Sequence, residues 1–258
     1  AGGGPDGGAI EPGLAETLTR QVATPDEARE AVRELARRDV DLVKLVLEPG
    51  YPGHEMKRLD PEVFRAAVQE AKARGLRTTV HVGTDEDVRL ALDAGVSGIE
   101  HSARGLSSQT IARMAASKTT FTPTLTVYDF EWKRAVLAGT AAEGARFVIP
   151  EILEGLRDPK GFFGTLSGDD PKIRALSGIF EEGVRRVGEA ARAGVPLLAG
   201  SDAVYPVTFH GAALVSLIFL RDLATLQTTR VSVSLSGGQP DDRSDLPIIA
   251  RSGGFVAF

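Results

Sequence analysis

Four polar residues stand in or directly after short apolar runs of the chain. They are Lys44 in DLVKLVLEPG, His81 in LRTTVHV, His101 in VSGIEHS and Asp202 in LLAGSDA. Imidazole nitrogens and carboxylate oxygens are donors that zinc and similar divalent ions bind in proteins. Two histidines and one aspartate therefore predict a metal site, provided that the fold brings them together.

Lys44 is the unexpected member of this set, because a charged ammonium repels a metal ion. It lies between Val43 and Leu45 in a run typical of a buried strand, where lysine is rare. Burial favours the neutral amine. A neutral amine can react with carbon dioxide to give a carbamate, an anion whose two oxygens can bridge two metal ions. A carboxylated lysine therefore explains both the residue type and its apolar setting.

The segments around these residues alternate between helical and strand-like patterns. Helical periodicity is expected over residues 24–38, 60–74, 84–94 and 106–118, and over much of 128–193. Apolar strands are expected over residues 41–47, 76–82, 96–102, 119–127 and 194–202. This alternation predicts an α/β fold with a parallel sheet. The four polar residues then lie near the carboxyl ends of their strands, the end at which (β/α)₈ barrels build active sites.

The motifs VKLVLE, TVHVGT, GIEHSARG and LLAGSDA, in this order, resemble the amidohydrolase superfamily, especially its imidazolonepropionase-like and prolidase-like members. The resemblance extends over about residues 20–225 and implies a TIM-type (β/α)₈ barrel. It implies that Lys44 is carboxylated and bridges two metal ions, and that His81 and His101 bind one of them. It also implies that Asp202 binds the other ion and accepts the proton of the attacking water.

The chain differs from this family at the first strand of the barrel, where members carry a His-x-His metal pair. Its four histidines stand at positions 54, 81, 101 and 210, and none forms such a pair. Counted backwards from Lys44, the first three strands would precede residue 1. We therefore expect an incomplete barrel of strands four to eight over residues 1–226, followed by a divergent tail over residues 227–258.

The resemblance implies a metal-dependent hydrolase that cleaves a C–N bond of an amide, a dipeptide or a cyclic amide. The expected cofactors are Zn²⁺ or another divalent ion, two per complete enzyme, and carbon dioxide as the lysine carbamate. Tyr128, after the strand at 119–127, and His210, in TFHG, are candidates for substrate contact.

Other interpretations of the same residues remain open. Lys44 could form a Schiff base, as in barrel aldolases, or could pair with Glu48 or Glu100. The histidines could be hydrogen-bonded core residues, and Asp202 could cap a helix or turn. The chain could also be an inactive fragment or one half of a two-chain assembly, as the missing His-x-His pair suggests.

Composition limits the classes of partner. The 258 residues carry a formal net charge of −5, which argues against nucleic-acid binding. No apolar run approaches the roughly 20 residues of a membrane span, so we expect neither partner and favour a cytoplasmic protein with a small-molecule substrate. The absence of cysteine excludes disulfides and thiolate metal sites. An open barrel exposes strand edges, so self-association is also expected.

Overall fold

The computed structural model divides into two compact units, Ala1–Asp129 with Gly168–Gly200 and Phe130–Ser167 with Ser201–Phe258. The structure describes residues 20–51, 54–55, 57–129, 150–151, 154, 171–202, 219–221, 228–230, 248–249 and 256–257.

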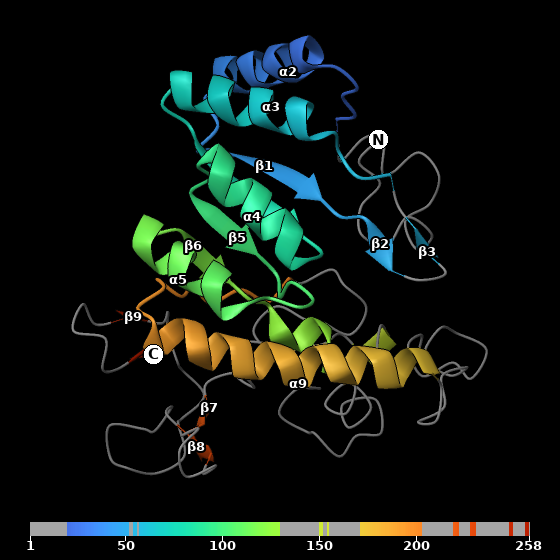
Figure 1. The fold of residues 1–258 in the computed structure, drawn as a ribbon, viewed down its shortest axis with the longest axis vertical. Coiled ribbons are helices and arrows are strands. Elements are labelled where there is room, and N and C mark those ends of the chain that lie inside the picture. Colours follow the sequence, from blue (N-terminus) through green and yellow to red (C-terminus); the bar gives the residue numbers. More distant parts are fainter. Residues whose placement is uncertain are drawn as a thin grey trace. The chain divides into compact units, whose positions relative to one another are not determined.

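The first unit contains a parallel sheet with the strand order β1-β4-β5-β6 (Figure 1). Its strands are β1 (Leu42–Leu47), β4 (Arg77–Val82), β5 (Gly98–Glu100) and β6 (Thr120–Thr122). Each strand pairs in parallel with the next along the chain, and a helix makes each connection. The predicted α/β class with parallel strands is confirmed.

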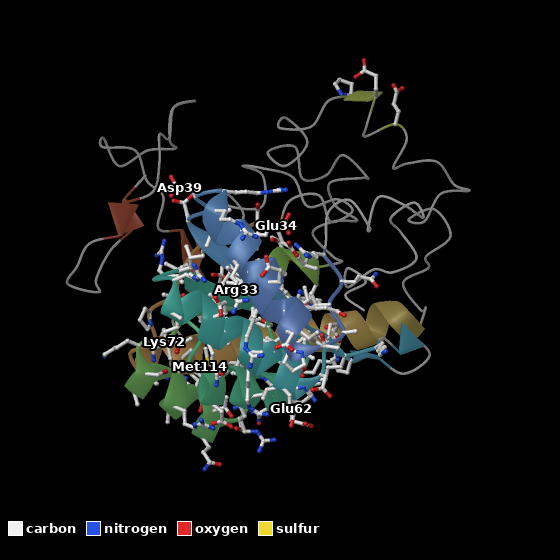
Figure 2. All side chains as sticks on the ribbon, turned by 90° about the horizontal axis from the view of Figure 1, so that it is seen from above. Arg33, Glu34, Asp39, Glu62, Lys72 and Met114 are labelled. Atoms are coloured by element: carbon white, nitrogen blue, oxygen red, sulfur yellow. The ribbon has the colours of Figure 1, made fainter. Side chains whose placement is uncertain are left out.

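In the described part of the first unit, five α-helices accompany this sheet. They are α2 (Pro25–Arg37), α3 (Pro61–Ala73), α4 (Asp85–Ala94), α5 (Ser108–Ser117) and α9 (Pro171–Arg192). Charged side chains such as Arg33, Glu62 and Lys72 project from the helices (Figure 2). Helix α4 begins with a capping box between Thr84 and Asp87 and ends at Gly95, whose φ of 83° is easily adopted by glycine.

The hydrophobic core lies between the helices and one face of the sheet. Strand residues Val80, Ile99 and Phe121 are buried in one cluster with Phe64 of α3 and Met114 of α5. Because side chains alternate across a strand, the residues between these strand positions face the opposite side. That opposite face carries polar side chains, namely Lys44, Thr79, His81, Glu100, Thr120 and Thr122.

The strand predicted over residues 119–127 is shorter than expected. Strand β6 ends at Thr122, and Leu125–Val127 form the 3₁₀ helix η1. Pro123 has no N–H to donate to a ladder, and Thr124 takes a left-handed conformation with φ of 42°. Apolar and β-branched residues alone therefore did not fix the length of this strand.

The predicted strand near residue 197 is present only as a short extended segment beside β6. Leu197 forms a parallel bridge with Phe121. The Phe121 N–H donates to Pro196 O at 2.9 Å, and the Leu198 N–H donates to Phe121 O at 2.9 Å. The segment therefore continues the sheet in the parallel direction.

The remaining described strands form antiparallel pairs. In the first unit β2 (Gly50–Tyr51) pairs with β3 (His54–Glu55). In the second unit β7 (Phe219–Arg221) pairs with β8 (Thr228–Arg230), and β9 (Ile248–Ile249) pairs with β10 (Val256–Ala257). The predicted division of the chain at residues 226 and 227 stays a prediction. Within the described part of the chain, no helix combines the length and the apolar character that a membrane span requires.

Replacing Asp87 should destabilise the first unit. Its carboxylate is fully buried, accepts a hydrogen bond from the Thr84 N–H at 2.8 Å and lies 2.6 Å from Arg58 Nη2. Asp87→Ala should lower the free energy of unfolding in urea by about 3 kcal/mol, because it removes a fully buried carboxylate that accepts the Gly83 and Thr84 N–H groups and pairs with the partly exposed Arg58. Asp87→Asn keeps an oxygen acceptor for the cap and should cost less. Equal losses in the two variants would contradict this assignment.

The sheet edges should promote self-association. The exposed large hydrophobic side chains among the described residues are Leu42, on the edge strand β1, and Leu198, beside β6. Leu42→Lys places a charge on the open edge, which disfavours edge-to-edge pairing. Light scattering should show less self-association for this variant than for the wild type. Gln69→Lys adds the same charge at an exposed position of α3 and should have no such effect.

Candidate functional site

His81 and His101 lie side by side at the carboxyl ends of adjacent parallel strands. His81 is in β4, and His101 directly follows β5. Their ring centroids are 4.5 Å apart with an interplanar angle of 59°, and each residue is only 7% exposed. Strand pairing therefore brings these two residues together although they are 20 positions apart in the sequence, and their role as metal ligands stays a prediction.

The His81 ring is anchored through one nitrogen by a buried carboxylate. His81 Nε2 lies 3.2 Å from Glu48 Oε2, and Glu48 is 9% exposed. Glu48 Oε1 accepts hydrogen bonds from the Gly50 N–H at 2.7 Å and from Arg104 Nη2 at 3.3 Å. Burial raises the pKa of Glu48, but the hydrogen bond to His81, the charge of Arg104 and the Gly50 amide outweigh it. The pKa of Glu48 is therefore held below its ordinary value.

The His101 ring is anchored by a hydroxyl group. His101 Nδ1 lies 2.7 Å from Thr124 Oγ1, and Thr124 is buried. Burial, with smaller contributions from the charges of His81 and Lys44, lowers the pKa of His101 to about 2. His101 is therefore a neutral imidazole at physiological pH, which is the form that binds metal ions.

Left-handed backbone conformations occur at non-glycine residues in both units, two of them just after strands β5 and β6 of the first unit. His101 (φ 69°), Thr124 (φ 42°) and Asp202 (φ 49°) adopt them without being glycine. The other described non-glycine residues with positive φ are Asp39 and Lys118, which follow helices α2 and α5. Such conformations cost free energy and persist at functional sites when surrounding contacts hold them. The backbone thus independently marks the strand ends as a candidate site.

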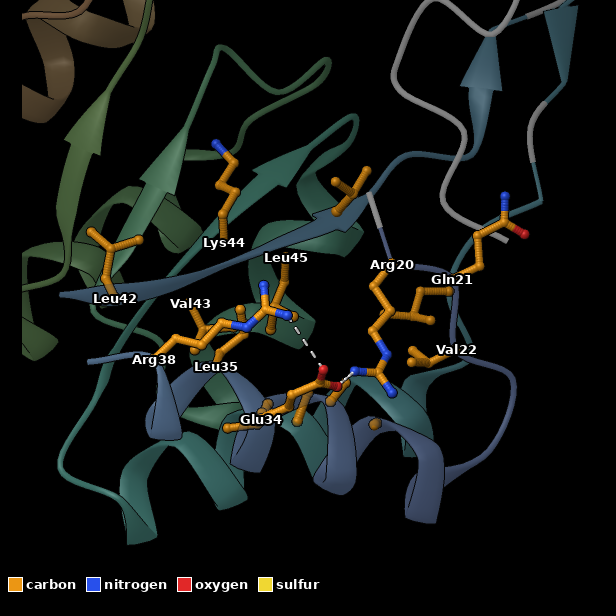
Figure 3. Close-up of a pocket in the computed structure, with 16 residues that line it drawn as sticks. Arg20, Gln21, Val22, Glu34, Leu35, Arg38, Leu42, Val43, Lys44 and Leu45 are labelled. Atoms are coloured by element: carbon orange, nitrogen blue, oxygen red, sulfur yellow. Dashed lines mark hydrogen bonds and ion pairs between the residues drawn. The ribbon is translucent and has the colours of Figure 1, made fainter. Parts of the chain in front are cut away.

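The prediction that Lys44 is buried is wrong. Lys44 is exposed, because β1 is the edge strand of the described sheet and the lysine points away from α2 and α3. Figure 3 shows Lys44 and Leu42 on one side of β1, and Val43 and Leu45 on the side of the helices. The positive charge of Lys44 is nevertheless one of the smaller causes that lower the pKa of His101.

A cavity of about 890 Å³ lies along β1 and α2 (Figure 3). Its charged lining includes Lys44 and an ion-pair cluster in which Glu34 contacts both Arg20 and Arg38. The described lining comes from β1, α2, α3 and their flanking residues and does not include either histidine. The cavity is therefore a feature of the open sheet edge and not the space around the histidine pair.

The other predicted residues are Asp202, Tyr128 and His210, and the structure does not determine the positions of Asp202 and His210 relative to the two histidines. Asp202 lies in the second unit, so its approach to the histidines stays a prediction. Tyr128 follows η1, is half-buried and donates its N–H to Leu125 O at 2.9 Å. His210 lies outside the described residues. Of the predicted metal ligands, the first unit therefore contains Lys44, His81 and His101.

In the described part of the first unit, a metal site with three donors requires Lys44 in addition to His81 and His101. No group of three or more His, Cys, Asp or Glu side chains is arranged to hold an ion in the described part of the chain. The two imidazoles nevertheless fit such a role, because each is fixed through one ring nitrogen, as metal-bound histidines generally are. Binding would use the other nitrogen, Nδ1 of His81 and Nε2 of His101.

Sequence reasoning missed Glu48, Arg104 and Thr124 as partners of the histidines. The sequence suggests Glu48 only as a partner of Lys44, and Glu100, the other candidate, accepts a hydrogen bond from the Thr79 hydroxyl. One signal was available for Glu48, which directly follows β1, at the same end of the sheet as His81. Thr124 gave no comparable signal, because its position depends on the turn after β6.

Comparison with known proteins identifies the family. The profile of the amidohydrolase family matches residues 10–241. Uncharacterized proteins of Mycobacterium tuberculosis (strain H37Rv) and Mycobacterium bovis are each 30% identical over 177 residues. These matches cover 67% of this chain and 40% of each mycobacterial protein. The chain therefore spans about two fifths of the length of the curated relatives that it matches.

Solved structures show the same fold. A prolidase complexed with N-methylphosphonate-L-proline has a TM-score of 0.52 at 21% identity, covering 79% of this chain and 45% of the prolidase. An amidohydrolase has a TM-score of 0.51 at 23% identity, covering 77% of this chain and 41% of that protein. These likenesses support the parallel α/β architecture of a TIM-type barrel.

Acidification should destabilise the metal-free chain through His101. Its pKa is lowered from 6.5 to about 2 in the folded state, so the unfolded chain binds a proton more readily between these values. The contribution of neutral His101 to the free energy of unfolding is fully present above about pH 6.5. It is lost as the pH falls, by about 2 kcal/mol at about pH 5. Urea unfolding with a chelator present should show this slope, and His101→Asn should flatten it. Identical slopes in both proteins would contradict the neutral His101.

Proposed function

Because the chain belongs to the amidohydrolase family, we propose that it forms part of a metal-dependent hydrolase that cleaves a C–N bond. The observation that carries this proposal is the pair of buried imidazoles, each anchored through one nitrogen, at the ends of β4 and β5. Adjacent neutral imidazoles held in this way are suited to binding a divalent ion.

The donors for the ion would be His81, His101 and a carboxylated Lys44. A carbamate would replace the positive charge of Lys44 by a negative one, which removes the repulsion between lysine and metal. It would form with carbon dioxide on the neutral amine and release one proton. When bound, the divalent ion supplies Lewis acidity, which lowers the pKa of water and polarises a carbonyl group.

The remaining proposed roles concern proton transfer and substrate contact. Asp202 would accept a proton from the attacking water and deliver it to the leaving amine, as a general base and then a general acid. The left-handed backbone at Asp202 is typical of residues that are held in place for function. Tyr128, half-buried after η1, and His210 are proposed to contact the substrate.

An amide, a dipeptide or a cyclic amide is the proposed substrate class. The solved relative with bound N-methylphosphonate-L-proline is a prolidase, and this makes dipeptides with a C-terminal proline the first substrates to assay. The partner is therefore proposed to be a small molecule and not a nucleic acid or a membrane.

A second possibility is that the chain is half of an assembly and is inactive alone. The position of β1 at the edge of the described sheet and the lack of a His-x-His pair among the four histidines favour this possibility. It predicts that hydrolysis requires a further segment carrying a His-x-His pair. Zinc binding by the histidine pair would not require that segment.

Zinc binding tests the proposal directly. His81→Ala and His101→Ala should each weaken zinc affinity in calorimetry by more than about 100-fold, since even outer partners of a ligand contribute about 10- to 100-fold. His54→Ala removes a histidine from β3 and should have no such effect. Unchanged zinc affinity in both site variants would refute the metal site.

Carboxylation of Lys44 can be measured separately from zinc binding. Protein incubated with zinc and ¹³C-bicarbonate should give a carbamate carbon signal in NMR. Lys44→Arg keeps the positive charge but has no amine able to form this lysine carbamate, so the signal should disappear and prolyl dipeptide hydrolysis should be lost. A signal that persists in Lys44→Arg would assign the carbamate to another residue.

A further inference from the structure

Glu48 makes contacts that go beyond filling space at the end of β1. One carboxylate oxygen, Oε2, faces His81 Nε2 at 3.2 Å. The other, Oε1, accepts the Gly50 N–H at 2.7 Å and Arg104 Nη2 at 3.3 Å. Both oxygens of a buried carboxylate are thus engaged, and one of them is directed at a candidate metal ligand.

We propose that Glu48 is a positioning residue that fixes the tautomer of His81, with the proton on Nε2 and the lone pair on Nδ1. This inference deepens the proposed function, on which its link to the metal rests. An ionised carboxylate can only accept hydrogen bonds, so the nitrogen that faces it must carry the proton. A neutral imidazole has one such proton, and Nδ1 is then left as its donor atom toward an ion.

Arg104 holds this carboxylate in place. Besides its contact with Glu48, Arg104 Nη2 donates to Gly50 O at 2.7 Å, so it joins the side chain and the backbone at the end of β1. The Arg104 backbone forms a parallel bridge with Thr84, just beyond β4. Arg104 thereby connects the chain segments that follow β1, β4 and β5, and its positive charge stabilises the ionised form of Glu48.

Gly83 provides the space that Glu48 needs. A Cβ atom at residue 83 would lie within 2.7 Å of Glu48 Cδ and Oε2, closer than real Cβ contacts allow. The backbone of Gly83 does not have the positive φ that would by itself demand glycine. The absence of a side chain at residue 83 is therefore explained by the carboxylate that occupies its place.

The test uses the full chain labelled with ¹⁵N and freed of metal. Long-range ¹H–¹⁵N NMR at a pH well above the ordinary histidine pKa reports which His81 nitrogen carries the proton. The wild type should show the proton on Nε2, and Glu48→Gln should show a mixture, because an amide can either donate or accept. Zinc affinity should fall by about 10- to 100-fold in the same variant.

Glu70→Gln is the matched control. The Glu70 side chain is 11% exposed and pairs with Arg33 and Arg74, whereas that of Glu48 is 9% exposed and pairs with Arg104. Glu70 lies in α3 and its side chain pairs with two arginines, so its variant should change neither the His81 tautomer nor zinc affinity. A shared loss of stability in the two variants would thus be separated from a specific effect on His81.

A double-mutant cycle tests the same inference without removing the carboxylate. Gly83→Ala should push Glu48 away from His81 and reproduce the tautomer mixture. In the Glu48→Ala background, Gly83→Ala should add no further change to the His81 signals. Arg104→Gln supplies another variant if Glu48→Gln does not fold, and it should shift the tautomer in the same direction.

The outcomes separate this inference from the proposed function. A proton on Nδ1 in the wild type would overturn the inference, as would an unchanged tautomer in the Glu48 variants, whether or not zinc binding weakens. The expected tautomer change in a chain that binds no zinc would support the role of Glu48 and overturn the metal-dependent function. The tautomer change together with weakened zinc binding supports both.

Discussion

The register of the parallel sheet is the constraint on which the candidate site depends. Val46, His81 and Glu100 are aligned as Cα partners across β1, β4 and β5, so their side chains share one face. A shift of one residue would turn every side chain of a strand to the other face. In β4 the register is held by Val80, which is fully buried against the helices and leaves His81 on the polar face. The packing of Val80 on one face of the sheet thereby positions His81 on the other face.

The sequence was sufficient to predict which elements form and which strand ends carry His81 and His101. Helical periodicity and the alternation of apolar residues are properties of a single segment, so they can be recognised without knowing which segments pack against it. The exposure of Lys44 was not predictable from its own run, because burial depends on which strand lies next to β1. The early end of β6 was similarly missed, although Pro123 offered a local reason for it.

The partners of the histidines depend on contacts between segments far apart in sequence. Glu48 and His81 are 33 residues apart, and His101 and Thr124 are 23 residues apart. Neither pair has a spacing that a helix or strand would produce, so no periodicity reveals it. The left-handed conformations at His101 and Thr124 are consistent with this mutual dependence, since the hydrogen bond between the two side chains helps to hold both strand ends in place.

The exposure of Lys44 changes the physical argument for a carbamate. The sequence suggested that burial drives the lysine toward its neutral form, but on the open edge strand this driving force is weakened. An ion bound to His81 and His101 would instead have to stabilise the carbamate by direct attraction. In the proposed site, carboxylation of Lys44 would then be a consequence of metal binding rather than its precondition. The structure shows the starting point for this proposed order, in which the imidazoles are buried and anchored and Lys44 is exposed.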